Sequence, residues 1–342
     1  MHRRTVLGAL GAAVLGMTAR ASDGDALTAA WRGWTARFLQ PDGRVVDPEQ
    51  AGISHSEGQG YALLLAQAVG DRDAFERIEG WTRAHLLIRD DALMAWRWTP
   101  GGGVVGEDWH NATDGDLFRV WALVRAARDS GWPVAEGTVE AIAADLSGSC
   151  LWPDPRAETE LLLRPSAESL ASDARVLLNP SYIMPRALRE IGAATGDTRL
   201  VRAADHGETC LSELASDGLL PDWIDVTATG YAPPTGHDLR SAYDALRIPL
   251  YLAWSDRAGH PAVRLAAEIL TSGDEVAVAR TGAGIVTARS DLPGYRALAR
   301  LAACAPVDPP EPASLAGPYY PAVLHMLVAL AAREGAPCAG SK

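Results

Sequence analysis

The sequence predicts an all-α fold in which helical hairpins close into a toroid. Apolar residues recur at three-to-four-residue spacing in eleven segments, which is the period of amphipathic helices. No Pro/Ser-rich linker divides the 342 residues, and helix-loop-helix units recur at intervals of roughly 50 residues. An open solenoid is the alternative, but solenoid repeats usually show clearer sequence similarity to one another.

The predicted helices are separated by loops rich in Gly, Pro and Asp, several of them about ten to twenty residues long. Loops of this length in a compact fold are usually functional. Residues 93–98 and 104–106 flank a Thr-Pro-Gly-Gly-Gly segment and predict a hairpin, and residues 223–229 are a further extended candidate. The helices are expected at residues 26–39, 60–69, 73–87, 117–127, 139–146, 185–191, 200–214, 242–254, 262–270, 295–304 and 321–332.

The charge balance excludes some classes of partner. The chain has 31 Lys and Arg against 43 Asp and Glu, a net charge of −12, whereas a nucleic-acid binder needs a positive field to neutralise phosphate. The eight histidines and four cysteines show no zinc-ligand spacing, so we expect no metal and no cofactor. The cysteines allow three disulfide pairings, among which the sequence does not choose.

Residues 1–21 have the form of a cleavable export signal. Arg3 and Arg4 precede an apolar stretch at 6–17 and an Ala-Arg-Ala cleavage site at 19–21, and the arginine pair resembles a twin-arginine signal, with Sec export left open. The apolar stretch is too short for a permanent anchor. We therefore expect a periplasmic or secreted protein without stable membrane insertion, whose residues 22–342 form a single domain.

Three carboxylates lie near predicted helix starts. Ser56 and Gln59 have the spacing of a capping box, which makes Glu57 the first helical residue. Thr113 and Asp116 repeat the pattern, with Asp114 in the same first-turn position as Glu57. Acidic residues at such positions often only complement the helix dipole, and this is the plain alternative to a functional role.

The third carboxylate is Asp244, which the apolar periodicity places inside the helix expected at 242–254. Arg247 follows one turn later, so a surface ion pair is the alternative interpretation. A toroid of alternating inner and outer helices brings such helix ends to one face. Paired carboxylates between aromatic walls are typical of glycoside hydrolases, in which one carboxyl group protonates the leaving oxygen while another carboxylate activates a water molecule.

Five motifs, in order along residues 24 to 330, resemble those of glycoside hydrolase family 8, and a late Gly-Pro-Tyr-Tyr at 317–320 resembles its C-terminal motif. The resemblance implies an (α/α)6 toroid with an open groove that hydrolyses β-1,4-linked glycans with inversion. The five motifs are Ser56-Glu57-Gly58-Gln59-Gly60-Tyr61, Leu93-Met94-Ala95-Trp96-Arg97-Trp98, Asn111-Ala112-Thr113-Asp114-Gly115-Asp116, Asn179-Pro180-Ser181-Tyr182 and Tyr243-Asp244-Ala245-Leu246-Arg247-Ile248-Pro249.

Carried over by position, the resemblance gives Glu57 the role of general acid and Asp244 that of general base. Asp114 matches the acidic residue that contacts the sugar at the cleavage subsite, Tyr182 a residue near the same subsite, and Arg247 one that supports the base. Asp116 and Tyr61, from the same motifs, are further candidates for substrate binding. The chain departs from the family pattern at Arg119 and Val120, where a small apolar pair is common.

Eleven Trp against three Phe is an unusual aromatic composition. Trp31, Trp34, Trp81, Trp121 and Trp254 lie on helical stripes and are expected in the core. Trp96, Trp98 and Trp109 lie in predicted loops or hairpins, where the flat indole suits the C–H face of a sugar ring, and we expect them to bind substrate.

Within the resemblance, cellulose-type β-1,4-glucan is the expected substrate. Many short exported members of the family accompany bacterial cellulose synthesis, so a partner in the cellulose synthase export machinery is compatible with this role. A chitosanase or xylanase of the same family is the nearest alternative. A non-catalytic glycan-binding protein of the exopolysaccharide machinery is the alternative from another class, and the presence of all three carboxylates disfavours it.

Overall fold

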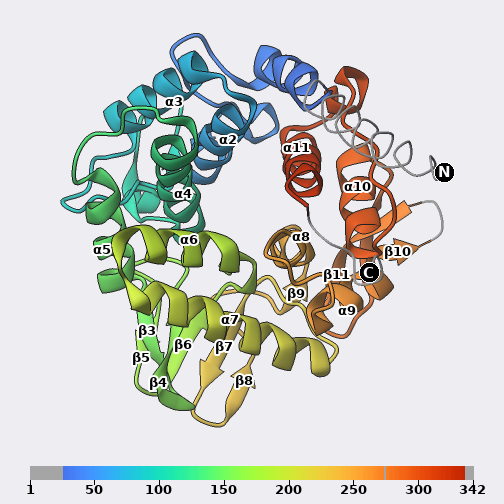
Figure 1. The fold of residues 1–342 in the computed structure, drawn as a ribbon. Helices are drawn as coiled ribbons and strands as arrows, with labels where there is room; N and C mark the ends of the chain where they lie inside the picture. The colour runs from blue at the N-terminus through green and yellow to red at the C-terminus, as the bar shows by residue number, and fades with distance from the viewer. Residues whose placement is uncertain (1–25, 273–274, 336–342) are drawn as a thin grey trace, which may run out of the picture.

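A computed structural model describes residues 26–272 and 275–335 and shows a ring of helices (Figure 1). Helices α2, α4, α6, α8 and α11 surround the centre, and the other helices pack outside them (Figure 1). The described helices are residues 26–38, α2 (Ser56–Val69), α3 (Arg72–His85), α4 (Thr113–Ser130), α5 (Thr138–Ser149), α6 (Pro185–Thr195), α7 (Thr198–Ser216), α8 (Arg247–Trp254), α9 (Pro261–Leu270), α10 (Pro293–Ala302) and α11 (Tyr319–Arg333).

The predicted toroid of helical hairpins is confirmed, and each predicted helix is present. One start is wrong by five residues: the helix expected from residue 242 begins at Arg247, because residues 243–246 form a turn. No described helix combines the length and the apolar run needed to cross a membrane. The predicted export signal at 1–21 lies outside the described residues.

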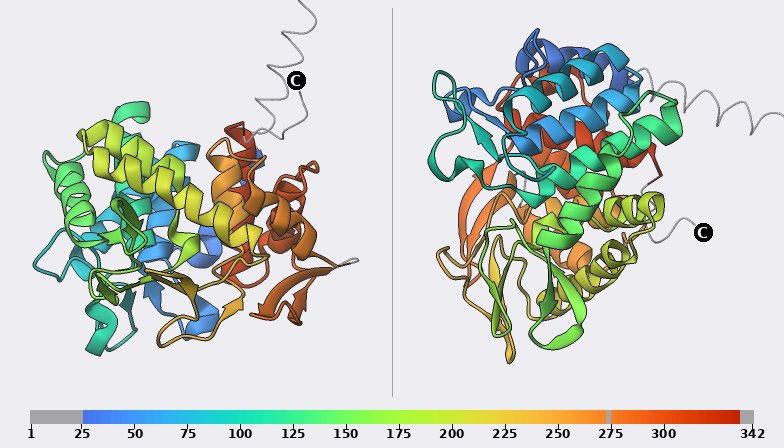
Figure 2. Two further views of the ribbon diagram at one scale, coloured as in Figure 1. Left: turned by 90° about the horizontal axis from the view of Figure 1, so that it is seen from below. Right: turned by 90° about the vertical axis from the view of Figure 1, so that its left-hand side faces the viewer.

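Short antiparallel strands gather at one end of the ring (Figure 2). The turn of the hairpin expected from 93–98 and 104–106 is present as a single antiparallel bridge between Thr99 and Gly103, but its two strands do not pair, because β2 pairs with β1. The extended segment expected at 223–229 contains β7. The strands are β1 (Ser54–His55), β2 (Arg97–Trp98), β3 (Leu151–Asp154), β4 (Ala157–Leu163), β5 (Ala171–Ser172), β6 (Arg175–Leu178), β7 (Ile224–Thr227), β8 (Gly230–Ala232), β9 (Arg240–Ser241), β10 (Thr271–Ser272), β11 (Glu275–Thr281) and β12 (Val286–Ser290).

Two glycines let the starts of α2 and α4 approach closely. A Cβ on Gly115 would lie 2.7 Å from the backbone carbon of Ser56, and a Cβ on Gly60 would lie 2.9 Å from the backbone oxygen of Gly115. Both distances are shorter than ordinary van der Waals contact. The absence of these side chains therefore allows Glu57 and Asp114, which neighbour this contact, to share one site.

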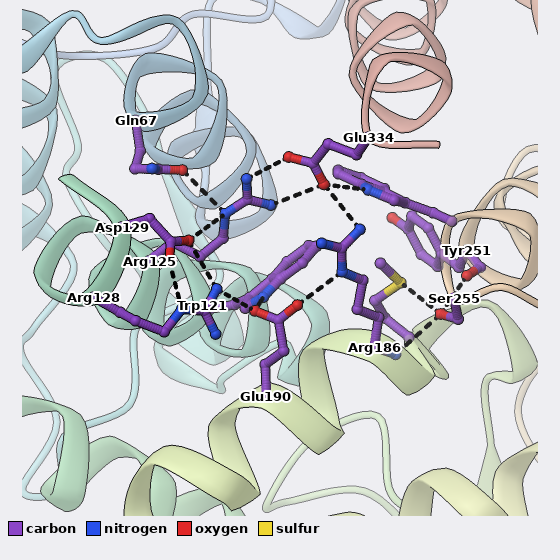
Figure 3. A network of polar contacts seen from close by, with 12 residues as sticks. Gln67, Trp121, Arg125, Arg128, Asp129, Arg186, Glu190, Tyr251, Ser255 and Glu334 are labelled. Atoms are coloured by element: carbon purple, nitrogen blue, oxygen red, sulfur yellow. Dashed lines mark hydrogen bonds and ion pairs between the residues drawn. The ribbon is translucent and has the colours of Figure 1, made fainter. Parts of the chain in front are cut away.

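A polar network joins the C-terminal parts of α2, α4, α8 and α11 to one another and to the start of α6 (Figure 3). Glu334, at the end of α11, accepts hydrogen bonds from Arg125 of α4 and from the Trp254 indole of α8, at 2.8 Å for the indole, and forms an ion pair with Arg186 of α6 at 2.9 Å. Arg125 also donates to Gln67 of α2. This network holds the ring closed at the end away from the strands.

Candidate active site

A cavity of about 640 Å³ opens at the end of the ring where α2, α4, α8 and α11 begin. Its walls contain the three carboxylates expected to form the site, Glu57, Asp114 and Asp244. Arg247, Tyr182 and Trp96 line the same cavity. Six of the ten predicted site residues, from five separate motifs, are therefore brought together.

Glu57 and Asp114 occupy equivalent positions, each the second residue of its helix. The expected capping boxes are wrong. His55 is the N-cap of α2 and its Nδ1 accepts a hydrogen bond from the Gly58 N–H at 3.0 Å, while Ala112 occupies the cap position of α4 without a side-chain bond. The caps therefore sit one residue earlier than the sequence pattern predicts.

Asp244 lies in the turn that precedes α8 rather than inside a helix. Its side chain is 33% exposed, so it reaches the cavity while its backbone is held in the wall. The amide Nδ2 of Asn179 donates to Asp244 Oδ2 at 3.3 Å. The Asn179 Oδ1 in turn accepts from the N–H and hydroxyl of Ser181, which fixes the orientation of the amide.

Arg247 is buried and contacts all three carboxylates. Its Nη1 donates to Glu57 Oε2 and, at 3.1 Å, to Asp114 Oδ2, while its Nη2 donates to Asp244 Oδ1 at 2.8 Å. Its guanidinium lies over the Tyr182 ring, with 5.5 Å between the guanidinium carbon and the ring centroid. One planar cation thus sets the relative positions of the three acids.

Burial perturbs two of these carboxylates. Burial raises the pKa of Asp114 well above its ordinary value, and the negative charge of neighbouring Glu57 raises it further against the opposing charge of Arg247. Burial likewise raises the pKa of Asp244, while the Arg247 guanidinium lowers it. Perturbed acids of this kind in one cleft indicate a catalytic site.

Aromatic side chains complete the walls. Tyr182 and Trp96 were expected there, and the structure adds Tyr243, Tyr319 and Tyr320. Tyr243 is 49% exposed, and the Tyr320 hydroxyl donates to its backbone oxygen. Tyr243 adjoins Asp244 in the sequence and Tyr319–Tyr320 form the late Gly-Pro-Tyr-Tyr motif, so adjacency to a motif was the signal that could have found them.

Four predicted substrate-binding residues do not line the cavity. Tyr61 and Asp116 are fully buried and do not line the cavity, and their contact with sugar stays a prediction. Tyr61 receives a hydrogen bond from Arg247, and Asp116 accepts from the Met94 N–H and the Asn111 amide.

The other two are Trp98 and Trp109. Trp98 packs against Trp81, and the indole of Trp109, 44% exposed, lies beneath the Arg89 guanidinium. Contact of Trp98 and Trp109 with a glycan that extends past the cavity stays a prediction.

The described residues include one group with the composition of a metal site, away from this cavity: Asp154, His206 and Cys210. Arg156 fills it, because its guanidinium pairs with Asp154 at 2.6 Å and lies 3.4 Å from the Cys210 sulfur. His206 pairs with the same carboxylate at 2.7 Å. Two cationic side chains in contact with the ligand atoms make this cluster a poor cation site. Cys150, Cys210 and Cys304 form no disulfide with one another, and Cys338 lies outside the described residues, so the pairing stays open.

Comparisons with known proteins agree with this arrangement. The model of the family "Glycosyl hydrolases family 8" matches residues 9–333. An endoglucanase of Cellulomonas uda is 31% identical over 278 residues, which cover 76% of each chain. A probable endoglucanase of Novacetimonas hansenii is 35% identical over 258 residues, 73% of this chain and 75% of that protein.

Solved structures show the same fold. Endoglucanase Cel10, a family 8 glycosyl hydrolase from Klebsiella pneumoniae, superposes with a TM-score of 0.81 at 28% identity over 89% of this chain and 99% of that one. Endo-β-1,4-glucanase CMCax from Acetobacter xylinum superposes with a TM-score of 0.76 at 31% identity over 91% and 99%. The predicted (α/α)6 fold class is confirmed by these likenesses together with the ring of helical hairpins.

Proposed function

Because the chain belongs to glycosyl hydrolase family 8, we propose that it is an endo-1,4-β-glucanase that hydrolyses cellulose-type β-1,4-glucan with inversion at the anomeric carbon. The observation that carries the proposal is the convergence of Glu57, Asp114 and Asp244 on Arg247 in one aromatic-walled cavity. The endoglucanase names of several relatives support the reaction and the substrate class.

In the proposed reaction, Glu57 donates a proton to the glycosidic oxygen as the bond to the anomeric carbon breaks. Asp244 takes a proton from a water molecule that attacks the same carbon from the opposite face of the ring. Inversion needs space for this water, so the two carboxyl groups are expected ~6.5–9.5 Å apart in the substrate complex. Arg247 fits the task of holding the two groups on either side of the reacting centre, since each of its terminal nitrogens contacts one of them.

Asp114 has a supporting role in this proposal. Its carboxyl is buried beside Glu57, and burial together with the Glu57 charge raises the pKa of Asp114, so Asp114 keeps its proton to a higher pH than an exposed carboxyl does. A retained proton is what the departing sugar oxygen requires. We propose that Asp114 keeps a proton available beside the general acid Glu57, in addition to its predicted contact with the sugar at the cleavage subsite.

The charge of the site suits a glycosidic transition state. The three carboxyl groups share one cation, Arg247, so the group carries a net negative charge whenever two or more of them are ionised. The sugar ring develops positive oxocarbenium character as the bond breaks. A preorganised negative environment stabilises that charge in the transition state more than the neutral ground state.

The test is reducing-end release from carboxymethylcellulose by the wild type, Glu57→Gln and Asp244→Asn. We expect each substitution to lower kcat by at least ~10²-fold, the typical contribution of a general acid or base. Asp225→Asn is the matched control, because Asp225 is fully buried on β7 and does not line the cavity. Undiminished activity of Glu57→Gln or Asp244→Asn would overturn the proposed roles.

Parallel assays on chitosan and xylan decide the substrate class. We expect the β-1,4-glucan to give the highest kcat/KM. A higher value on chitosan or xylan would replace the glucanase proposal by the corresponding alternative, and no release from any of the three by the wild type would favour a glycan-binding protein.

We further propose export to the periplasm or the medium after removal of residues 1–21, and a role beside bacterial cellulose synthesis, with the cellulose synthase export machinery as a compatible partner. The charged start, the apolar stretch and the Ala-Arg-Ala site support export. Mass spectrometry of the protein from a periplasmic or culture fraction tests it: we expect the chain to begin at Ser22, and an intact N-terminus would contradict signal cleavage.

A further inference from the structure

A buried carboxylate outside the cavity lies directly behind the turn that carries Asp244. Asp222 precedes β7 and is 1% exposed. Its Oδ1 accepts hydrogen bonds from the backbone N–H groups of Ala242, at 2.7 Å, and Ala245, at 3.1 Å. These residues flank Tyr243 and Asp244, so a single oxygen holds both ends of the segment that presents the proposed base.

The turn is also held by backbone hydrogen bonds from the Leu246 N–H to the Ala242 oxygen, at 3.2 Å, and from the Arg247 N–H to the Asp244 oxygen, at 3.1 Å, and by the Tyr320 hydroxyl, which donates to the Tyr243 oxygen. Leu246, the N-cap of α8, makes no side-chain cap bond, and N–H groups at a helix start have no partners within the helix. Asp222 supplies the acceptor from a different part of the chain. Its own position is fixed, because its N–H donates to the backbone oxygen of Arg240 at 2.8 Å and its Oδ2 accepts from the Arg240 guanidinium at 3.1 Å.

We propose that Asp222 is a positioning residue for Asp244: it fixes the turn that aims the base into the cavity, and it keeps a negative charge behind that base. The inference rests on the proposed function of Asp244 as the general base. Asp222 lies outside the cavity walls, so it acts on the reaction only through the turn and through its charge.

The charge of Asp222 acts in a defined direction. After burial, which raises the pKa of Asp244, and Arg247, which lowers it, Asp222 has the next largest effect and raises it, ahead of Glu57. A base with a higher pKa accepts a proton from water more readily, provided that it stays ionised at the working pH. The other groups that interact with Asp244 are the amide of Asn179, the carboxyl of Asp114 and the hydroxyls of Tyr182 and Tyr320.

Two substitutions separate the hydrogen bonds from the charge. Asp222→Asn keeps an oxygen that can accept from Ala242 and Ala245 but removes the charge, and the amide that replaces Oδ2 faces Arg240, whose side chain is 56% exposed and can turn to solvent. Asp222→Ala removes both. Asp225→Asn is the matched control, since Asp225 is an equally buried carboxylate three residues along that also accepts a backbone N–H and an arginine.

The experiment measures kcat and kcat/KM on carboxymethylcellulose across the acidic pH range, with thermal unfolding of each variant. For Asp222→Asn we expect kcat at the optimum within about threefold of the wild type, and an acidic limb displaced to lower pH by roughly half a unit or more, because the charge that opposes ionisation of Asp244 is gone. For Asp222→Ala we expect kcat to fall at least ~10-fold with little change in KM, as for a misplaced catalytic group. Asp225→Asn is expected to leave the acidic limb in place.

Asp222→Asn with an unmoved acidic limb, or Asp222→Ala with wild-type kcat, would overturn the positioning role. A lower melting temperature of Asp222→Asn without a displaced limb would likewise show a structural role alone. Asp244→Asn distinguishes a failure of the proposed function from a failure of this inference. If Asp244→Asn keeps wild-type activity, Asp244 is not the base. If Asp244→Asn is inactive but the Asp222 variants behave like the wild type, only the positioning role of Asp222 is contradicted.

Discussion

The close approach of α2 and α4 predicts a large effect of one added methyl group, in Gly115→Ala. The new Cβ would lie 2.7 Å from the backbone carbon of Ser56, roughly 0.7 Å short of the 3.4 Å at which ordinary contact begins. A backbone atom cannot rotate away, so the start of α2 must shift, and Glu57 is the next residue. Overpacking of this kind costs ~1–3 kcal/mol, and a displacement approaching 1 Å at a reacting group costs up to ~10²-fold in rate.

The assay is kcat on carboxymethylcellulose together with the melting temperature. We expect Gly115→Ala to lose at least ~10-fold in kcat and several degrees in Tm. Gly80→Ala is the matched control: Gly80 lies within α3, a Cβ there meets nothing within 4 Å, and alanine in a helix is favoured by ~0.5–1 kcal/mol. Gly115→Ala with the kcat and Tm of Gly80→Ala would refute the reasoning that this glycine contact sets the catalytic geometry.

Three further predictions concern charges. Asp114→Asn should move the alkaline limb of the pH–rate profile to lower pH by about one unit, because the buried carboxyl with the raised pKa no longer retains a proton beside Glu57; an unmoved limb would remove this explanation. Glu334→Gln should destabilise the protein by ~2–4 kcal/mol in thermal or urea unfolding, because Arg125 and Arg186 lose their shared carboxylate. Glu76→Gln, which breaks an exposed ion pair, is the control and should have little effect. Equal losses of unfolding free energy in the two variants would contradict a stabilising role of the Glu334 network. Burial opposes the charged form of His206, but the ion pair with Asp154 outweighs it and raises the pKa of His206 to about 10. The ion pair therefore stabilises the protein fully below about pH 6.5, and this stabilisation is lost as the pH rises through about 10. The difference in unfolding free energy between the wild type and His206→Gln should shrink over that range, and a constant difference would contradict the role of the ion pair.

The sequence predicted the helices well because each one buries an apolar stripe whose period is visible in the chain. It misplaced the start of α8 because residues 242–246 carry mostly apolar side chains that continue this period, while the backbone there is tied to Asp222, about twenty residues away. It also chose Ser56 as a helix cap, where pairing of β1 with β2 and contact with Tyr319 bring His55 into that position.

The candidate site was predictable to the extent that its residues lie in compact motifs. Glu57, Asp114 and Asp244 each stand in a recognisable segment, and the fold brings these segments together. The role of Asp222 has no local signature, because its two bonds go to backbone N–H groups that exist in any sequence. The burial of Tyr61 was equally hidden, since a tyrosine one turn after Glu57 faces either the cavity or the core depending on how α2 packs.

The most direct test of the acid–base assignment is the stereochemistry of hydrolysis, followed by proton NMR on a soluble cello-oligosaccharide during the first minutes of reaction. With Glu57 as acid and Asp244 as base on opposite faces of the sugar, the new reducing end appears first as the α-anomer and later mutarotates. Initial release of the β-anomer would mean a covalent intermediate and a nucleophilic carboxylate, and would contradict the roles proposed for Glu57 and Asp244.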